Sequence, residues 1–304
     1  MRKIFLLLAF CFTCYGTKIA AQTTPEKSAL FDETELLKHL KSLSSDAFEG
    51  RRTGTKGAIK ARKYIINQFH SLKVKPLGKS FNQSFSFVKK KNYYGINVLG
   101  LVEGVKFPKK YIVISAHYDH EGIKNGKIYN GADDNASGLS ALFAFAEYFR
   151  NNPPEHSVIL AAFDSEELDL QGSKYFVKNT FIPFKDILVN LNMDMISRSD
   201  KNELFVTGTS QNKKLANLIT NVKHSENIQL ITGHDGNDDL DNWTYASDHA
   251  NFHKNGIPFL YFGVEDHKDY HEPSDTYENI HPEFYIEAVK SIISVFKEID
   301  TSRF

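Results

Sequence analysis

Histidine and carboxylate side chains recur directly after short apolar runs in the middle of this chain. They are His117 and Asp119 after the first run, Glu166 and Glu167 after the second, and Asp194 after the third. Carboxylates and imidazoles without sulfur suit Zn²⁺ with open coordination positions, or Mn²⁺ or Co²⁺. In a pair of adjacent glutamates, one can bind the metal while its neighbour serves as general base toward a bound water. The residue types therefore predict metal-assisted hydrolysis.

Two further segments belong to the same pattern. The sequence GADDNASG occupies 131–138, and a loop after a later apolar run ends in Tyr270 and His271. The spacing of His117 and Asp119 is typical of a metal ligand with a carboxylate that holds its other ring nitrogen. A single carboxylate after a strand is more often a helix cap or a surface charge. Five such pieces in order are much harder to explain as caps.

The elements that must position these residues alternate along the chain. Short apolar runs predict strands, and apolar residues at spacings of three and four predict helices. The expected strands are 82–88, 111–116, 157–163, 187–191, 203–206 and 258–262, and the expected helices are 34–43, 58–69, 136–150, 172–179, 213–223 and 282–300. This alternation indicates an α/β fold with a central mixed, mostly parallel sheet flanked by helices. Such sheets carry their functional residues at the carboxyl ends of the strands. We see no internal repeat or linker, so we expect 22–304 to form a single domain.

The first 21 residues predict a secretory signal peptide. Arg2 and Lys3 precede nine apolar residues at 4–12, and small residues end the segment at Ala21. Removal of 1–21 would take away both cysteines and three basic residues, which would change the formal charge from 0 to −3. An exported chain without cysteine has no disulfide and no thiolate ligand or nucleophile. We therefore expect export to the periplasm, the cell surface or the medium.

Composition narrows the function further. The chain has 304 residues with 37 Lys+Arg and 37 Asp+Glu, and 41% of its residues are hydrophobic, which is ordinary for a globular protein. The balanced charge argues against nucleic acid as a partner, because phosphate binding usually shows as a basic excess. No later run reaches the ~18 apolar residues of a membrane helix, so no membrane span is expected.

Together these motifs resemble peptidase family M28, a family of dinuclear zinc peptidases that includes bacterial leucyl aminopeptidases. The run GADDNASG is specific when it follows HYD, here at 117–119, and precedes a Glu-Glu pair. The stretch LSSDAFEGR at 43–51 also resembles the N-terminal part of the family, so the resemblance covers most of the chain. It implies a zinc exopeptidase-like fold, of the phosphorylase/hydrolase-like kind, and two Zn²⁺ per chain.

The resemblance also implies a role for each matching residue. Five residues would bind metal, with Asp134 shared by both ions: His117 and Asp194 at one ion, Glu167 and His271 at the other. Asp119 would hold His117 from behind, and Glu166 would act as general base. Tyr270 would either donate a hydrogen bond to the tetrahedral oxyanion or form an aromatic wall of the pocket. The peptide bond between Asp134 and Asn135 is often cis in the family.

A Ser-Asp-His sequence at 247–249 resembles a family segment near the site. Three adjacent residues cannot face one another as a catalytic triad, so no serine-hydrolase chemistry is predicted there. We expect Asp248 to cap a helix or to support the site from outside. His249 and His253 are spaced as neighbours on a helix but lack the glutamate of a zinc-binding HExxH motif.

An acidic loop at 235–241 is less expected. Its oxygen-bearing side chains stand at alternate positions, as at the start of a calcium loop: Asp235, Asn237, Asp239 and Asp241. Leu240, however, stands where an EF-hand requires glycine. Three interpretations stay open, which are an additional Ca²⁺ site, a solvated loop, and a rim that attracts the ammonium group of a substrate.

The predicted activity is that of an exported zinc-dependent exopeptidase, with an aminopeptidase preferred. Its partner would be a peptide, whose N-terminal bond is hydrolysed by a water activated by two metals. Three alternatives remain. One is a carboxypeptidase or N-acyl amino-acid deacylase of the same fold, another is a glutaminyl cyclase-like transferase that uses one zinc, and the third is a non-catalytic binding domain. The complete ligand set argues against the last two.

Overall fold

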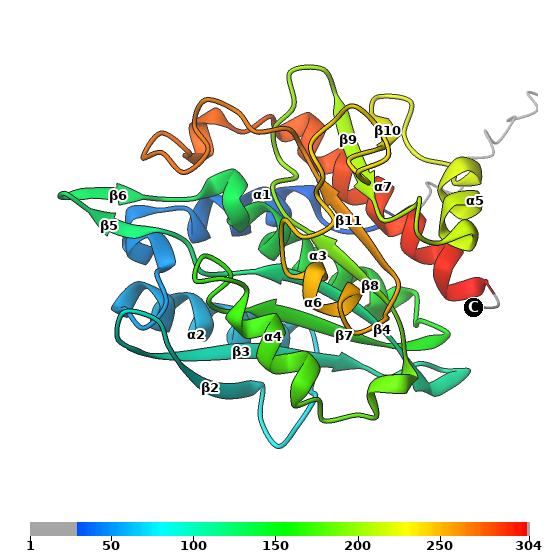
Figure 1. Ribbon diagram of the computed structural model, residues 1–304, viewed down its shortest axis with the longest axis horizontal. Helices are drawn as coiled ribbons and strands as arrows, with labels where there is room; N and C mark the ends of the chain where they lie inside the picture. The colour runs from blue at the N-terminus through cyan, green and yellow to red at the C-terminus, as the bar shows by residue number, and fades with distance from the viewer. Residues whose placement is uncertain (1–28, 303–304) are drawn as a thin grey trace, which may run out of the picture.

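A nine-stranded sheet runs through the middle of the molecule, and helices cover both of its faces (Figure 1). The computed structural model describes residues 29–302, so the predicted signal peptide at 1–21 lies outside the described residues. The strand order is β1-β3-β7-β4-β8-β11-β9-β10, and β2 also pairs with β3. This confirms the predicted mixed α/β sheet flanked by helices.

The centre of the sheet is parallel. Its four strands are β7 (His156–Phe163), β4 (Phe107–His117), β8 (Ile187–Met193) and β11 (Phe259–Gly263). Antiparallel pairs join the remaining strands at both sides, except that β10 runs parallel to β9. These strands are β1 (Lys75–Pro76), β2 (Asn82–Val88), β3 (Asn92–Val102), β9 (Glu203–Thr207) and β10 (Gln229–Thr232). A separate hairpin is formed by β5 (Gly122–Lys124) and β6 (Lys127–Tyr129).

The helices divide between the two faces of the sheet. One face carries α1 (Glu33–Leu43), α2 (Lys56–Ser71), α3 (Gly138–Asn151), α5 (Lys213–Asn221) and α7 (Pro282–Thr301). The other face carries the short helices α4 (Gln171–Lys178) and α6 (His249–His253), which lie in front of the sheet in Figure 1. Within 29–302, no helix is both long and apolar enough to cross a membrane.

Successive side chains of the central strands enter two different cores. Ile112 and Ile114 of β4 pack into the larger core with the helices of the first face, whereas Val113 packs with Phe176 and Phe252 of the second. Every residue of β7 is buried. Burial on both faces explains why these strands are almost continuously apolar.

The sequence did not predict β3, although this strand spans eleven residues. Gly95 and Gly100 interrupt its apolar pattern, and glycine weakens a strand signal. Both glycines make room for neighbours: a Cβ at Gly95 would lie 2.3 Å from the ring of Phe85, and one at Gly100 would lie 2.6 Å from Val74. Close packing therefore requires the same two glycines that make the strand difficult to predict from the sequence.

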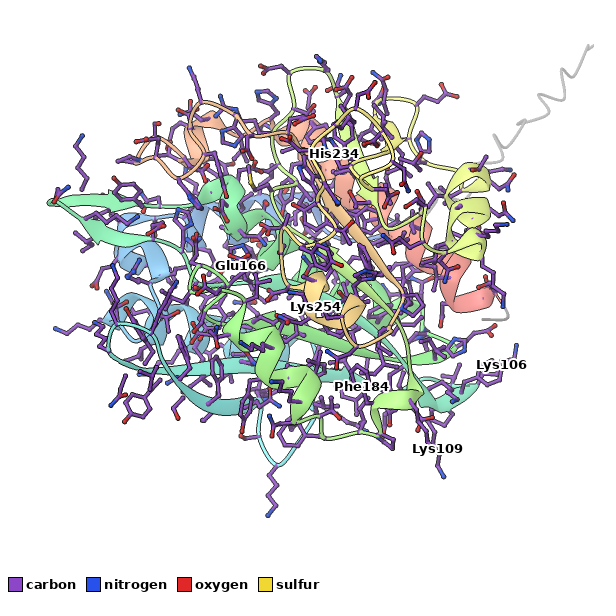
Figure 2. The ribbon with its side chains drawn as sticks, in the orientation of Figure 1. Lys106, Lys109, Glu166, Phe184, His234 and Lys254 are labelled. Atoms are coloured by element: carbon purple, nitrogen blue, oxygen red, sulfur yellow. The ribbon has the colours of Figure 1, made fainter. Side chains whose placement is uncertain are left out.

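The two ends of the central strands differ in their surroundings. Figure 2 shows Lys106 and Lys109 pointing outward near the amino end of β4, whereas Glu166 lies inside the molecule near the carboxyl end of β7. The first four residues of β4 are exposed and its last six are buried. The strands thus deliver the residues that follow them into a protected region.

Candidate metal centre

Three adjacent parallel strands end at the same edge of the sheet and bring the predicted residues together. His117 is the last residue of β4, Asp194 follows β8 directly, and Glu166 and Glu167 come shortly after β7. The register pairs His117 with Phe163 across β4 and β7, so the segment after β7 begins beside His117. The loop after β11 supplies His271.

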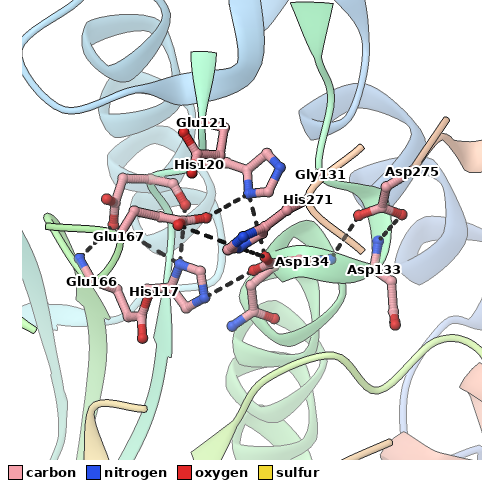
Figure 3. Close-up of polar contacts among 12 residues, drawn as sticks. His117, His120, Glu121, Gly131, Asp133, Asp134, Glu166, Glu167, His271 and Asp275 are labelled. Atoms are coloured by element: carbon pink, nitrogen blue, oxygen red, sulfur yellow. Dashed lines mark hydrogen bonds and ion pairs between the residues drawn. The ribbon is translucent and has the colours of Figure 1, made fainter. Parts of the chain in front are cut away.

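Asp134 stands between two groups of donors (Figure 3). Its Oδ1 lies 3.2 Å from Nε2 of His117, and its Oδ2 lies 3.1 Å from Nε2 of His271. On the first side, His117 Nε2 is also 3.1 Å from Oδ1 of Asp194. On the second side, His271 Nε2 is also 3.4 Å from Oε2 of Glu167. All five residues predicted to bind metal therefore meet at one place, with Asp134 in the shared position.

This donor set fits Zn²⁺. Bonds of about 2.0–2.1 Å in a tetrahedral zinc site place neighbouring ligand atoms about 3.3 Å apart, which is the spacing seen on both sides of Asp134. The ion pairs that Asp134, Glu167 and Asp194 form within the described residues are all with imidazoles. Buried carboxylates at this density call for a cation among them.

The charges of the protein alone point the same way. Burial raises the pKa of Asp134, but the imidazoles of His120, His117 and His271 lower it by more, to well below its ordinary value. Burial and the charge of Asp134 raise the pKa of Glu167. The imidazoles of His120 and His271 outweigh both and lower this pKa to about 2. Burial lowers the pKa of His271, yet Asp134 and Glu167 raise it to about 11. These carboxylates therefore favour a positive neighbour.

The loop that carries Asp134 is held by a carboxylate far along the chain. Asp275 accepts hydrogen bonds from the backbone N–H groups of Asp133 at 2.9 Å and Asp134 at 3.0 Å. The side chain of Asp133 in turn accepts from the N–H and hydroxyl of Ser197. The peptide bond from Asp134 to Asn135 is cis, as expected from the family resemblance.

Arg51 supports the same loop from the N-terminal side. Its guanidinium is fully buried and donates to the backbone carbonyls of Leu43, Tyr118, Asn130 and Gly131, at 2.6–2.9 Å. Burial lowers the pKa of Arg51 to about 10, against the opposing effect of nearby carboxylates, so the side chain stays charged at neutral pH. The stretch at 43–51 that resembles the family therefore supports, through Arg51, the loop that carries Asp134.

Glu166 and Asp119 are linked, although not in the way that the sequence predicted. Nδ1 of His117 lies 3.0 Å from the backbone carbonyl of Asp119 and 3.9 Å from its carboxylate. The carboxylate Oδ1 instead accepts from the backbone N–H of Glu166 at 2.9 Å. Asp119 thus contacts His117 through its backbone and fixes the Glu166 backbone through its side chain.

Glu166 is partly buried beside the cluster and is not one of the paired carboxylates. Burial raises its pKa well above the ordinary value, His117 opposes this, and the charges of Asp194 and Asp248 add to it. A carboxyl group with a raised pKa takes up a proton readily, as a general base must.

A pocket of about 100 Å³ opens onto one side of the cluster. Its wall contains His117, Asp134, Glu166, Asp194, Met195, Trp243, Ala246, Tyr261, Val264, Asp266, Tyr270 and His271. The ring of Tyr270 stacks on that of His271, with centroids 4.0 Å apart and planes at 26°. Tyr270 therefore lines the pocket. Its two predicted roles, as hydrogen-bond donor to the oxyanion and as aromatic wall, stay predictions.

Sequence reasoning missed His120, which directly follows Asp119. The side chain is fully buried, and its Nδ1 lies 2.8 Å from Oε1 of Glu167 and 3.5 Å from Oδ2 of Asp134. The signal was available, because the chain reads HYDH and places a second histidine at the same strand end as His117.

The acidic loop at 235–241 does not bring its carboxylates together as a calcium site would. Asp235 is buried and accepts from Gly208 N, Thr209 Oγ1 and Ser210 N at 2.6–3.1 Å, so its carboxylate is committed to the turn after β9. Within the described part of the chain, the clusters of three or more His, Cys, Asp or Glu donors that could hold an ion all lie around His117, His120 and His271. Asp235, Asp239 and Asp241 are therefore not gathered as ligands of one ion. This argues against the Ca²⁺ interpretation of Asp235, Asn237, Asp239 and Asp241 and favours the other two.

Asp248 lies beside the site rather than capping a helix. It precedes α6 but makes no capping hydrogen bond with its side chain, which is fully buried. Burial raises its pKa to about 7, with His117 opposing. Nε2 of His249 lies 2.8 Å from the carbonyl of Trp243, away from the metal cluster.

Known structures place this fold in a class. A zinc aminopeptidase from Bacillus subtilis, BSAP, matches with a TM-score of 0.68 at 17% identity, over 90% of this chain and 97% of that one. Porphyromonas gingivalis glutaminyl cyclase matches with a TM-score of 0.72 at 16% identity, over 89% of this chain and 99% of that one. The fold is thus the zinc aminopeptidase-like α/β fold.

The family follows from the sequence. The model of peptidase family M28 matches residues 97–296, which contain every residue of the cluster, and the chain belongs to peptidase family M28. Aminopeptidase YwaD of Bacillus subtilis (strain 168) is 28% identical over 195 residues, which cover 59% of this chain and 40% of that protein. The chain spans about half or less of the length of two curated relatives that it matches, at 49% and 40%.

Proposed function

We propose that this protein is a two-zinc aminopeptidase. The observation that carries the proposal is the position of Asp134, whose two carboxylate oxygens face two separate groups of donors at 3.1–3.2 Å. Membership of family M28 and the similarity to a protein named as an aminopeptidase support it.

The proposed ligands follow the two sides of Asp134. His117 and Asp194 would hold one ion, and Glu167 and His271 would hold the other. Bound Zn²⁺ supplies polarisation of the scissile carbonyl and a lowered pKa for the attacking water. The remaining work belongs to side chains of this protein.

Glu166 is the proposed general base. Its backbone is fixed by Asp119, it lines the pocket beside His117 and Asp194, and its raised pKa allows it to hold a proton between two steps. It would accept a proton from the attacking water and return it to the leaving amine. Tyr270, in the same wall, would donate a hydrogen bond to the carbonyl oxygen as negative charge develops there.

The pocket favours a short substrate end that carries a positive charge. It is small, at about 100 Å³, and its wall includes the carboxylates of Glu166 and Asp266, which are not among the proposed metal ligands. The free ammonium group of a peptide N-terminus suits such a wall better than a C-terminal carboxylate does. This supports an aminopeptidase over a carboxypeptidase.

A peptide panel tests the proposal. Each peptide is offered with a free and with an acetylated N-terminus, before and after chelation and zinc return. We expect release of the first residue only from free N-termini, lost on chelation and restored by zinc. Metal-dependent cleavage that is indifferent to acetylation would instead support a carboxypeptidase or endopeptidase, and activity that requires the acyl group would support a deacylase.

A glutaminyl cyclase-like reaction is the second candidate, because structures of glutaminyl cyclases share the fold over nearly their whole length. Peptides with N-terminal glutamine separate the two reactions. Cyclisation releases ammonia and breaks no peptide bond, so the peptide keeps all its residues. An aminopeptidase instead releases free glutamine and shortens the peptide by one residue. A metal content near one per chain would favour the cyclase.

We also propose that the protein is exported, on the grounds of the signal-peptide pattern at 1–21. Expression of the full chain followed by N-terminal sequencing tests this. The expected mature protein begins near Gln22 and is recovered outside the cytoplasm; an intact Met1 in the soluble cytoplasmic fraction would contradict it.

A further inference from the structure

His120 occupies the side of the cluster that also contains Glu167 and His271 (Figure 3). The side chain comes from the segment between β4 and β5 and is fully buried. Its Nδ1 lies 3.5 Å from Asp134 Oδ2, the same oxygen that faces His271. This separation matches the spacing of about 3.3 Å between two ligands of one tetrahedral zinc ion.

His120 and Glu167 approach at ion-pair distance without the alignment of a regular hydrogen bond. Nδ1 of His120 and Oε1 of Glu167 are 2.8 Å apart, yet neither atom has a hydrogen-bond partner among the described residues. Buried polar atoms without a partner are costly and rare. Two such atoms that face each other next to Asp134 are explained by a cation that both of them bind.

Packing holds the imidazole ring in this position. A Cβ at Gly131 would lie 2.6 Å from two ring atoms of His120, so only glycine leaves space for the ring. Gly131 is itself fixed, because its carbonyl accepts from Arg51. Nε2 of His120 has no hydrogen-bond partner among the described residues, so the backbone of Gly131 takes the orienting part that a hydrogen bond often plays for a metal-bound histidine.

Glu121 does not compete well for the same place. It is near enough to Glu167 and His271 to share an ion with them, but its carboxylate lies 3.0 Å from the guanidinium of Arg52 and is only partly buried. The charge of Glu121 is thus already balanced, whereas the ring nitrogens of His120 have no hydrogen-bond partner within 29–302.

We propose that Nδ1 of His120 is an additional ligand of the metal that Glu167 and His271 bind, and that the two metal positions are therefore unequal. This inference rests on the proposed two-zinc function. One position has four protein donors, from Asp134, His120, Glu167 and His271. The other has three, from Asp134, His117 and Asp194.

Four protein ligands close a tetrahedral zinc site, whereas catalytic sites keep a position open. The pocket agrees with this division. Its wall includes His117, Asp194 and Glu166 together with His271 and the shared Asp134, whereas Glu167 and His120 are not part of it among the described residues. Both ligands that belong to the His117 position alone therefore face the pocket, but only one of the three that belong to the His120 position alone does so. The His117 position is thus the exchangeable one where substrate and water meet, and the His120 position binds its ion tightly and permanently.

Metal binding to the full chain tests the inference directly. Metal-free protein is titrated with Zn²⁺ in competition with a chromophoric chelator, for wild type and for His120→Asn. Wild type should bind two ions with clearly different affinities. His120→Asn should weaken the tighter step by more than the ~10–100-fold that loss of an outer hydrogen-bond partner costs, and should leave the weaker step nearly unchanged.

His156→Asn is the matched control. His156 is also a buried histidine that contacts a carboxylate, Asp300, but it stands at the first residue of β7, at the opposite edge of the sheet. The His156→Asn variant should bind both ions as wild type does. Parallel weakening in both variants would mean that a general loss of packing, and not a lost ligand, is responsible, and would overturn the inference.

A spectroscopic readout on wild type covers the case in which His120→Asn does not fold. Protein loaded with a single Zn²⁺ is examined by X-ray absorption, which counts imidazoles around the ion. Two imidazoles per zinc, from His120 and His271, are expected, and one imidazole would overturn the inference. With Co²⁺ as the single ion, intense visible absorption of a four-coordinate site is expected, and a weak six-coordinate spectrum would overturn it.

The outcomes keep the two levels of the proposal apart. If wild type binds two ions of equal affinity and His120→Asn does the same, the role of His120 is refuted while the two-zinc function stands. If wild type binds no metal and cleaves no peptide, the proposed function fails, and the role of His120 fails with it.

Discussion

The two ends of β7 carry the same types of residue but differ in their hydrogen bonding. At the amino end, Nδ1 of His156 lies 3.1 Å from the carboxylate of Asp300, which also accepts from the backbone N–H groups of Glu155 and His156 at 2.7–2.8 Å. At the carboxyl end, the ion pairs of Asp134, Glu167 and Asp194 within the described residues are all with imidazoles. The Asp300 carboxylate thus has hydrogen-bond donors for both of its oxygens. The carboxylates at the other end have more acceptor oxygens than there are donors around them.

The difference shows what distinguishes a metal centre from a buried ion pair. A histidine and a carboxylate in contact are found at both ends of the strand. Only at the carboxyl end do carboxylate oxygens outnumber the imidazole donors near them and leave buried atoms such as Glu167 Oε1 without a hydrogen-bond partner among the described residues. Unbalanced acceptors, rather than residue type, indicate the missing cation.

The largest effect is expected from Asp134→Ala. Both oxygens of this carboxylate contribute, one to each side of the centre, so both ions should be lost together and peptide cleavage should become undetectable. Metal analysis after dialysis measures this. Asp300→Asn, the matched change at the other end of β7, should retain both ions; loss of a single ion from Asp134→Ala would refute the shared position.

Glu166→Gln should sharply reduce turnover while leaving the metal centre intact. The general base is removed without removal of a proposed ligand, so kcat should fall by ~10²–10⁴-fold with two ions still bound. Steady-state kinetics and metal analysis of the same preparation are the measurements. Activity close to that of wild type would show that another group accepts the proton.

Tyr270→Phe separates the two roles predicted for this residue. If the hydroxyl donates to the oxyanion, kcat should fall by about 10²-fold or more with KM little changed, and the folded protein should bind metal normally. If the ring is only a wall of the pocket, Phe should support nearly full activity. The ratio of kcat to KM effects on one dipeptide series decides between them.

Asp119→Asn should affect metal binding less than the ~10–100-fold that loss of a carboxylate behind a metal-bound histidine typically costs. His117 is held by the backbone carbonyl of residue 119, which the substitution keeps. Burial and the neighbouring Asp164 raise the pKa of Asp119 well above its ordinary value, so a neutral amide is a close replacement. Zinc affinity should stay within about tenfold of wild type, and a larger loss would restore the carboxylate as the partner of His117.

The smallest effect on function is expected from His156→Asn. Loss of the contacts with Asp300 should lower the free energy of unfolding by about 1–3 kcal/mol, the cost of unpaired buried polar groups. Denaturant titration measures this. Peptide cleavage, scaled to the folded fraction, should match wild type, and a loss of bound zinc would erase the distinction between the two ends of the strand.

Local patterns were enough to predict much of the fold and of the centre. His117, Glu167 and Asp194 follow buried apolar strands, and such strands are visible in the sequence. Partners that act from far along the chain were not predictable in this way. Asp275 holds Asp134 from 141 residues away, and Arg51 reaches Gly131 across 80. No periodicity links such positions.

The differences from the sequence-based expectations have equally specific causes. The glycines of β3 hide a strand because packing against Phe85 and Val74 excludes side chains. The acidic loop resembled a calcium site because the sequence does not show that Asp235 turns inward to bind backbone N–H groups. Both cases depend on neighbours that only the folded chain brings close.

The buried guanidinium of Arg51 has a consequence for how this protein acquires and keeps its ions. Arg51 ties the N-terminal part of the described chain to the loop of Asp134, and His271 and Asp275 approach the same loop from the C-terminal part. A zinc ion would therefore join segments from both ends of the domain, and its binding energy would add to the stability of the whole. Resistance to heat and proteolysis should then rise with the concentration of free zinc, so that metal supply sets the lifetime of the folded chain.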